Sequence, residues 1–127
     1  LPICQRDAYT WEFELRRKRG GHLFSKHRYL SAQMEAYLTD DLWLRLATQA
    51  NAMGPRLANG LRERQAQVPE APANMMFPEW DEGRHVRLET AGAAYNRLPA
   101  PPGHERARLV TSWSTNEADV DGFLAAF

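Results

Sequence analysis

The chain has 127 residues, of which 43% are hydrophobic and 25% are charged. This length suits a single domain and excludes most large enzyme architectures. Sixteen basic and sixteen acidic side chains cancel, which argues against a general nucleic-acid binder, because such proteins carry a basic surface. The apolar runs are too short to cross a membrane. The one cysteine, Cys4, cannot form an internal disulfide, which we interpret as typical of a cytoplasmic protein.

Two helices are expected in the first forty residues, separated by a glycine pair. Residues 9–19 are rich in helix formers until Gly20-Gly21 breaks the pattern. Residues 25–38 contain apolar side chains at i, i+4 and i+8, which is the spacing of one helix face. These side chains are Leu30, Met34 and Leu38.

A longer third helix is predicted from Leu42 onward. Its apolar residues recur every three or four positions, at Leu42, Leu46, Ala50, Met53, Leu57 and Leu61. The acidic pair Asp40-Asp41 directly precedes it and is expected to cap its N-terminus. Gly54-Pro55 lies inside the pattern. Because proline removes a helical hydrogen bond, we expect a kink there or two helices joined end to end.

The second half of the chain is predicted to form a small sheet with two further helices, after a linker at 65–74. Strands are expected at 75–77, 94–98 and 106–113, and helices at 81–91 and after Ser114. We expect Pro78 to end the first strand and Gly92 to follow the first of these helices. The S-x-x-E pattern from Ser114 to Glu117 predicts a capping box at the start of the last helix. That helix should bury Val120, Phe123 and Leu124.

The strand at 106–113 alternates between two faces. Its expected buried side chains are Ala107, Leu109, Thr111 and Trp113, and its expected outer side chains are Arg108, Val110 and Ser112. These elements predict an α/β protein of the α+β type. We expect N-terminal helices packed on a small, mainly antiparallel sheet, as a two-layer sandwich. The domain would span 1–127, with a divergent segment at 1–11, a helical part at 12–64 and the sheet part at 73–127.

Most of the polar residues are expected to have structural roles. The histidines lack metal-ligand spacing, and we interpret each as a surface or turn residue, namely His22, His27, His85 and His104. Asp119 and Asp121 are interpreted as favourable first-turn charges of the last helix. We expect neither a metal site nor a nucleophilic role for Cys4.

Two features could bind an anion. The basic turn at 16–26 places Lys18, Arg19 and Lys26 around the glycine pair, where backbone N–H groups and a helix start could hold a phosphate. The alternative is a solvated basic turn. Arg108 is presented from a strand otherwise suited to burial and could hold a carboxylate through its bidentate fork. The alternative is a surface arginine on an edge strand.

Several segments resemble low-specificity L-threonine aldolases. Residues 16–53 resemble the segment after the cofactor lysine, residues 73–80 and 89–99 resemble small-domain strands, and residues 108–127 resemble the C-terminal strand and helix. The resemblance covers about residues 12–127 in continuous order. It implies the C-terminal small domain of a pyridoxal-phosphate (PLP) enzyme of fold type I, in the beta-eliminating lyase family. Such enzymes cleave β-hydroxy-α-amino acids to glycine and an aldehyde.

The resemblance also implies roles for individual residues. Arg108 occupies the place of the arginine that holds the substrate carboxylate. Lys18, Arg19 and Lys26 are the candidates that approach the cofactor phosphate. The family's Schiff-base lysine lies upstream in a TKNG-like motif, but none of the seventeen residues before Lys18 is a lysine. The resemblance therefore implies no catalytic residue and no PLP bound by this chain alone.

Three hypotheses about function follow. The first is a free-standing, truncated aldolase-like domain, a gene fragment or remodelled descendant that forms homo-oligomers and has no aldolase activity of its own. The second is a subunit of a split enzyme, whose partner is a PLP-binding large domain. The third is a small module that binds a carboxylate or a phosphate. We expect no nucleic-acid or membrane partner in any of these cases.

Overall fold

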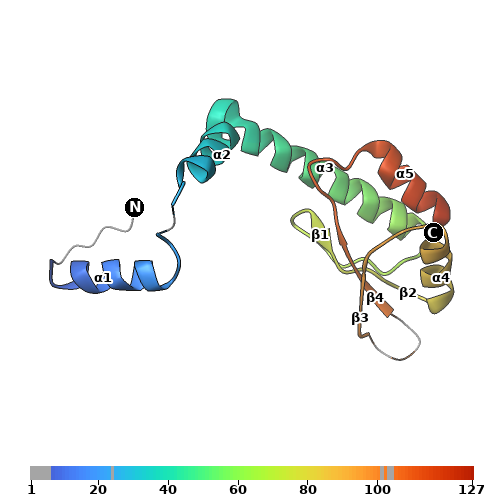
Figure 1. The fold of residues 1–127 in the computed structure, drawn as a ribbon. Coiled ribbons are helices and arrows are strands. Elements are labelled where there is room, and N and C mark those ends of the chain that lie inside the picture. Colours follow the sequence, from blue (N-terminus) through green and yellow to red (C-terminus); the bar gives the residue numbers. More distant parts are fainter. Residues whose placement is uncertain (1–6, 24, 101, 103–104) are drawn as a thin grey trace. The chain divides into compact units, whose positions relative to one another are not determined.

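The computed structural model describes residues 7–23, 25–100, 102 and 105–127 (Figure 1). Cys4 and His104 lie outside these ranges, as do most of the segment 1–11 and part of the turn expected at 99–103. The chain divides into two compact units, Leu1–Asp40 and Asp41–Phe127, which are described separately. Within the described ranges, none of the helices is both long enough and apolar enough to cross a bilayer.

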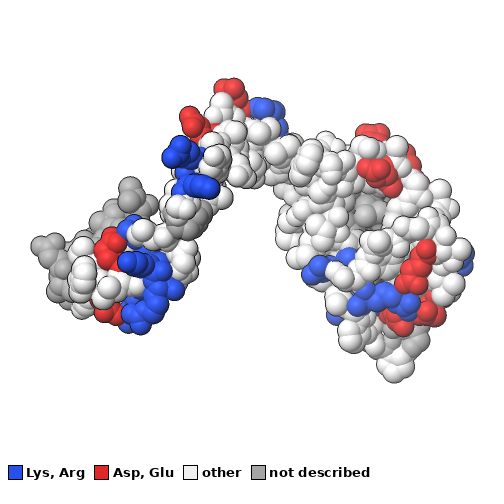
Figure 2. Space-filling model, viewed as in Figure 1, with Lys and Arg blue, Asp and Glu red and all other residues white. Residues whose placement is uncertain are grey.

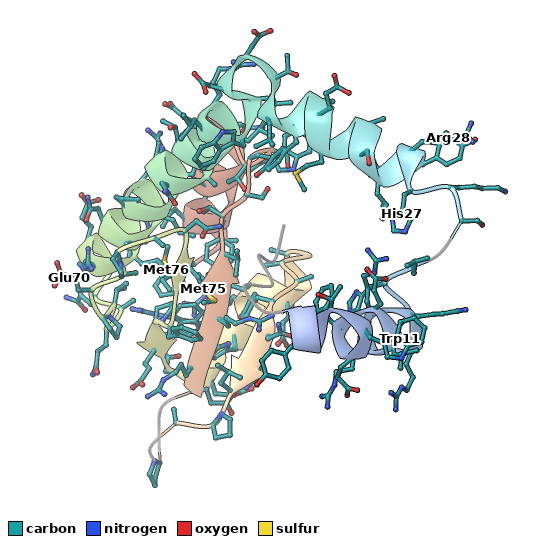
Figure 3. All side chains as sticks on the ribbon, turned by 90° about the vertical axis from the view of Figure 1, so that its left-hand side faces the viewer. Trp11, His27, Arg28, Glu70, Met75 and Met76 are labelled. Carbon is teal, nitrogen blue, oxygen red and sulfur yellow. The ribbon has the colours of Figure 1, made fainter. Side chains whose placement is uncertain are left out.

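The first unit contains α1 (Asp7–Arg19) and α2 (Arg28–Leu38), so the two expected helices are confirmed with shifted starts. The glycine pair ends α1 as expected, because Gly21 adopts a positive φ of 74° that few other residues tolerate. None of the residues of α2 is buried, and Trp11 on α1 is 72% exposed (Figure 3). The apolar side chains of this unit are therefore largely exposed to solvent.

The second unit begins with the long helix α3 (Leu42–Glu63), after a short 3₁₀ turn at Thr39–Asp41. The expected cap at Asp41 is wrong, because Asp41 is left-handed, with φ 55° and ψ 30°, and its side chain makes no cap hydrogen bond. Side-chain capping needs an extended backbone at this position. Of the two outcomes expected at Gly54-Pro55, a kink or a division into two helices, the division is wrong, since α3 continues through Pro55. At Gly54 the helix comes close to the chain at residues 73–74, and an added Cβ would lie 3.3 Å from the Ala73 carbonyl.

The sheet is antiparallel and is organised around β4 (Glu105–Val110), with which all the other strands pair (Figure 1). On one edge, β1 (Met75–Met76) pairs with the C-terminal half of β4, and β2 (Glu79–Trp80) pairs with its N-terminal half. On the other edge lies β3 (Asn96–Leu98). The second strand, β2, was not expected from the sequence.

Alternation along β4 separates a buried face from an open one, as predicted. Ala107, Leu109 and Thr111 are buried, whereas Arg108 and Val110 are exposed. The expectation for Trp113 is wrong, because the strand ends at Val110 and Trp113 is 64% exposed. Beyond Val110 the chain forms a turn, in which the Thr115 N–H donates to the Ser112 carbonyl. The alternation of buried and exposed side chains along the strand therefore does not extend to Trp113.

Two further helices complete the unit, α4 (Glu82–Thr90) and α5 (Glu117–Ala126). Asp81 caps α4 by accepting from the Arg84 N–H, and Gly92 follows that helix with a φ of 89°. The capping box of α5 is displaced from the predicted one. Asn116 and Asp119 form it, because the Ser112–Thr115 turn delays the helix until Glu117.

The hydrophobic core lies between the helices and one face of the sheet. Its largest fully buried apolar side chains include Leu61 on α3, Met76 on β1 and Leu88 on α4. Met75, the neighbour of Met76, is 43% exposed, as expected for the opposite face of a strand (Figure 3). On α3 the predicted apolar stripe is buried from Ala50 to Leu61 and half-buried at Leu42 and Leu46. The α+β fold class predicted from the sequence is thereby confirmed.

Candidate functional site

A cavity of about 370 Å³ lies in the second unit, where the β3–β4 pair meets the start of α5. Its wall includes Arg108, the strand residue predicted to bind a carboxylate. Apolar side chains contribute much of the remaining wall, among them Leu57 of α3 and Val120 and Phe123 of α5. A largely apolar cavity with a few polar groups is the usual form of a small-molecule site.

Arg108 faces Asn96 across the β3–β4 pair, and both residues line the cavity. Directly opposed residues in an antiparallel pair have their side chains on the same face of the sheet, within about 5 Å of each other at Cβ. Among the described residues, the Arg108 guanidinium has neither a hydrogen bond nor an ion pair, unlike Arg97 and Arg106 on the same pair of strands. Its donors are therefore available to a ligand.

The start of α5 adds polar groups to the same cavity, at Thr115 and Asp119. The capping box holds Asp119 in place, because its Oδ2 accepts from the Asn116 N–H at 2.9 Å and its own N–H donates to Asn116 Oδ1 at 3.0 Å. Thr115 is held by Ser112, whose N–H donates to Thr115 Oγ1 at 2.9 Å. The first-turn role expected for Asp119 is thus confirmed, and its place in the cavity wall is an additional finding.

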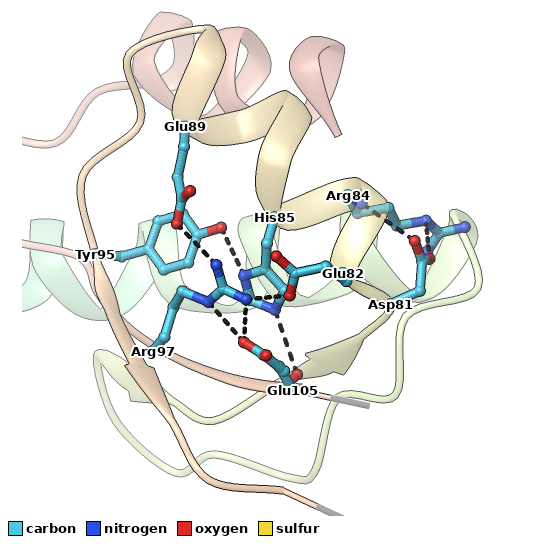
Figure 4. Close-up of polar contacts among 8 residues, drawn as sticks. All are labelled: Asp81, Glu82, Arg84, His85, Glu89, Tyr95, Arg97 and Glu105. Atoms are coloured by element: carbon cyan, nitrogen blue, oxygen red, sulfur yellow. Dashed lines mark hydrogen bonds and ion pairs between the residues drawn. The ribbon is translucent and has the colours of Figure 1, made fainter. Parts of the chain in front are cut away.

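Tyr95 connects the cavity to a charged cluster on the neighbouring surface (Figure 4). Arg97 lies at the centre of this cluster and forms ion pairs with Glu82 and Glu105. Its Nη1 also lies 3.4 Å from Glu89 Oε1. The hydrogen bond with Arg97 lowers the pKa of Glu105, and hydrogen bonds to Glu105 and Glu82 raise the pKa of Arg97. Burial, with a smaller contribution from Glu89, raises the pKa of Tyr95 to about 12. Tyr95 is therefore neutral at physiological pH.

His85 is fully buried beneath this cluster, so its interpretation as a surface or turn residue is wrong. Its Nδ1 lies 2.8 Å from the Tyr95 hydroxyl, and its ring stacks at a tilt on Trp80 with centroids 4.9 Å apart. These contacts fix one side of the cavity wall through Tyr95. Across the described ranges, no group of three or more histidine, cysteine or acidic side chains is arranged to hold a metal ion.

The predicted phosphate-proximal residues lie in the first unit. Lys18 and Arg19 belong to the basic last turn of α1, and Lys26 precedes α2 with a φ of 68°. Basic side chains gather over this part of the chain in the space-filling view (Figure 2). The N–H groups of residues 20–22 donate to carbonyls of α1. An anion bound at this turn would therefore depend on the three side chains and not on the glycine backbone.

These features define an α+β domain with a small-molecule cavity at one edge of its sheet. No protein-family model matches the chain. The low-specificity L-threonine aldolase of Pseudomonas aeruginosa is 37% identical over 112 residues, which cover 83% of this chain and 30% of that protein. That of a Pseudomonas species, strain NCIMB 10558, is 33% identical over 115 residues, covering 86% of this chain and 31% of that protein.

Similarity in structure accompanies similarity in sequence. The structure of a threonine aldolase from Leishmania major superposes on this chain with a TM-score of 0.79 and 26% sequence identity. The match covers 86% of this chain and 32% of the Leishmania chain. The resemblance to low-specificity L-threonine aldolases is therefore confirmed, and the match is consistent with a C-terminal domain. The chain spans about 30% of the length of the relatives it matches.

Proposed function

We propose that this chain is the carboxylate-binding part of a threonine-aldolase-like enzyme and that Arg108 holds the carboxylate of the substrate. The observation that carries the proposal is the position of the Arg108 guanidinium in the wall of a cavity, with no hydrogen bond or ion pair to any described residue. A planar guanidinium fits a carboxylate through two parallel hydrogen bonds. The similarity to threonine aldolases favours this function over an unrelated anion-binding module.

The residues present do not fit the PLP cofactor that the resemblance implies. A PLP enzyme of this kind needs a lysine amine beside its substrate site. The sequence contains two lysines, Lys18 and Lys26, and neither stands in a TKNG-like motif such as the one the resemblance implies for the Schiff-base lysine. We therefore assign no catalytic residue to this chain, and we propose that Lys18, Arg19 and Lys26 serve only as side chains near a phosphate.

A partner is part of this proposal. The exposed apolar side chains of the first unit, together with a match to about 30% of its relatives, support a covering surface supplied by a PLP-binding large domain or by another copy of the chain. We propose the large domain as the first of these, whether it belongs to the same polypeptide or to a separate one, and self-association as the alternative.

Replacing Arg108 with alanine is expected to weaken the binding of propionate, a simple monocarboxylate, about 5- to 30-fold. The loss reflects charge-assisted hydrogen bonds from the one basic side chain that the described residues place in the cavity wall. Lysine at this position should recover only part of the affinity, because its ammonium lacks the planar fork. Isothermal titration calorimetry or NMR titration of the chain measures both effects.

The matched control is Arg87→Ala, which removes the same charge from an exposed position on α4 of the same unit, outside the cavity. It should leave the propionate affinity unchanged. Equal affinities of the Arg108→Ala variant and the unmodified chain would contradict the proposed function, as would a loss of equal size in the control.

The chain alone is expected to release no glycine from L-threonine, even with PLP added. The physical reason is that neither of its two lysines stands in the TKNG-like motif that the resemblance implies for the Schiff base. Co-expression with a large domain that bears the lysine should restore the reaction, and Arg108→Ala in that complex should lower kcat/KM. A chromatographic assay for glycine makes the measurement, and glycine release by the chain alone would overturn this part of the proposal.

A further inference from the structure

The cavity wall contains opposite charges that are not paired with each other. Arg108 comes from β4 and Asp119 from the first turn of α5. Arg108 has no ion pair among the described residues, so its nitrogens lie beyond 4 Å from the Asp119 carboxylate. Both charges therefore border the same open space, about 370 Å³ in volume, without neutralising each other.

Asp119 is held in this position by the backbone of its own helix. Its Oδ2 is occupied by the Asn116 N–H, whereas Oδ1 has no hydrogen-bond partner among the described residues. Other acidic residues of α5 are engaged elsewhere, because Glu117 and Asp121 both pair with Arg56. Asp119 is thus the acidic side chain of α5 that lines the cavity and keeps an oxygen free.

We propose that Asp119 is a specificity-determining residue of the Arg108 cavity, selecting ligands that carry an ammonium group beside their carboxylate and disfavouring ligands with a second negative charge. This inference rests on the proposed carboxylate-binding role of Arg108. Asn96, opposite Arg108 on β3, adds a neutral amide at the carboxylate end. A zwitterion then satisfies both charges of the wall, whereas a dianion places a like charge near Asp119.

The expected size of the effect follows from Coulomb's law. Near a solvated surface, water screens the attraction between two opposite unit charges, and exposed pairs contribute least. We therefore expect selectivity changes of about three- to tenfold. Such changes exceed the error of a titration while leaving the carboxylate contact intact.

The experiment compares propionate, alanine and succinate as probes, in NMR titrations of the whole chain at constant ionic strength. Propionate carries one negative charge, alanine adds an ammonium group and succinate adds a second carboxylate. The Asp119→Asn variant should lower the affinity for alanine relative to propionate and raise that for succinate relative to propionate, each by about three- to tenfold. The asparagine oxygen can still accept from the Asn116 N–H, so the capping box is retained.

Asp121→Asn is the matched control, because it makes the same change two residues away on α5, outside the cavity. Its two affinity ratios should equal those of the unmodified chain. Unchanged ratios in Asp119→Asn, with propionate binding still weakened in Arg108→Ala, would overturn the role of Asp119 alone. Propionate binding that does not depend on Arg108 would instead overturn the proposed function.

Discussion

Replacing Leu61 with alanine is expected to lower the free energy of unfolding of the second unit by about 2–5 kcal/mol. Leu61 is fully buried on α3, in the cluster that also contains Leu57, Met76 and Leu88. Truncation removes its apolar contacts and leaves a cavity that a packed interior fills only in part. Because small domains are stable by only about 5–15 kcal/mol, this single change removes a large share of the total.

Leu44→Ala provides the matched control for this prediction. It makes the same substitution in the same helix, but Leu44 is 44% exposed. Alanine has at least the helix propensity of leucine, so the expected change is within about 0.5 kcal/mol. Equilibrium denaturation in urea, followed by fluorescence and circular dichroism, gives both values. Equal losses for the two variants would contradict the position of the core described for α3.

The third helix could be predicted from sequence because its signal is local. A repeat of three or four residues from Leu42 to Leu61 defines one face of a helix without reference to the rest of the chain. The same holds for Arg108, whose outer position follows from the period of two along β4. In both cases the deciding information lies within a short window of residues.

The second strand, β2, could not be predicted in this way. Pro78 was expected to end the pairing, because proline has no N–H to donate. The carbonyl of Pro78 nevertheless accepts from the Ala107 N–H at 2.9 Å, so the chain stays beside β4 and pairs again at Glu79 and Trp80. Such a strand depends on a partner that is distant in sequence, and no local pattern identifies it.

The candidate site was predictable only in part for the same reason. Arg108 carried a sequence signal of its own, whereas Asn96 belongs to the cavity through the register that places it opposite Arg108. Asp119 showed a first-turn pattern that the structure confirms, but its second position, in the cavity wall, depends on how α5 packs against the sheet. A residue can both cap a helix and line a cavity. The sequence alone reveals only the capping role, because the cavity depends on tertiary packing.

Replacing Gly60 with alanine is expected to destabilise the second unit by about 1–3 kcal/mol, the usual cost of an overpacked core. Helix α3 packs against α5 at this residue, and a Cβ added there would overlap Leu124 Cδ1 and lie 2.9 Å from Leu124 Cδ2. Leu124 belongs to the core and has little room to move. Steric overlap therefore outweighs the gain of up to about 1 kcal/mol that alanine normally brings to a helix interior.

Gly122→Ala in α5 separates the two effects. An added Cβ at Gly122 meets no other atom within 4 Å, so only the helix preference remains, and the variant should be more stable by about 0.5–1 kcal/mol. The two substitutions are chemically identical but should change stability in opposite directions, as measured by the midpoint of urea unfolding. A stabilising Gly60→Ala would mean that α3 and α5 do not approach closely at this residue. A destabilising Gly122→Ala would instead contradict the open position described for Gly122.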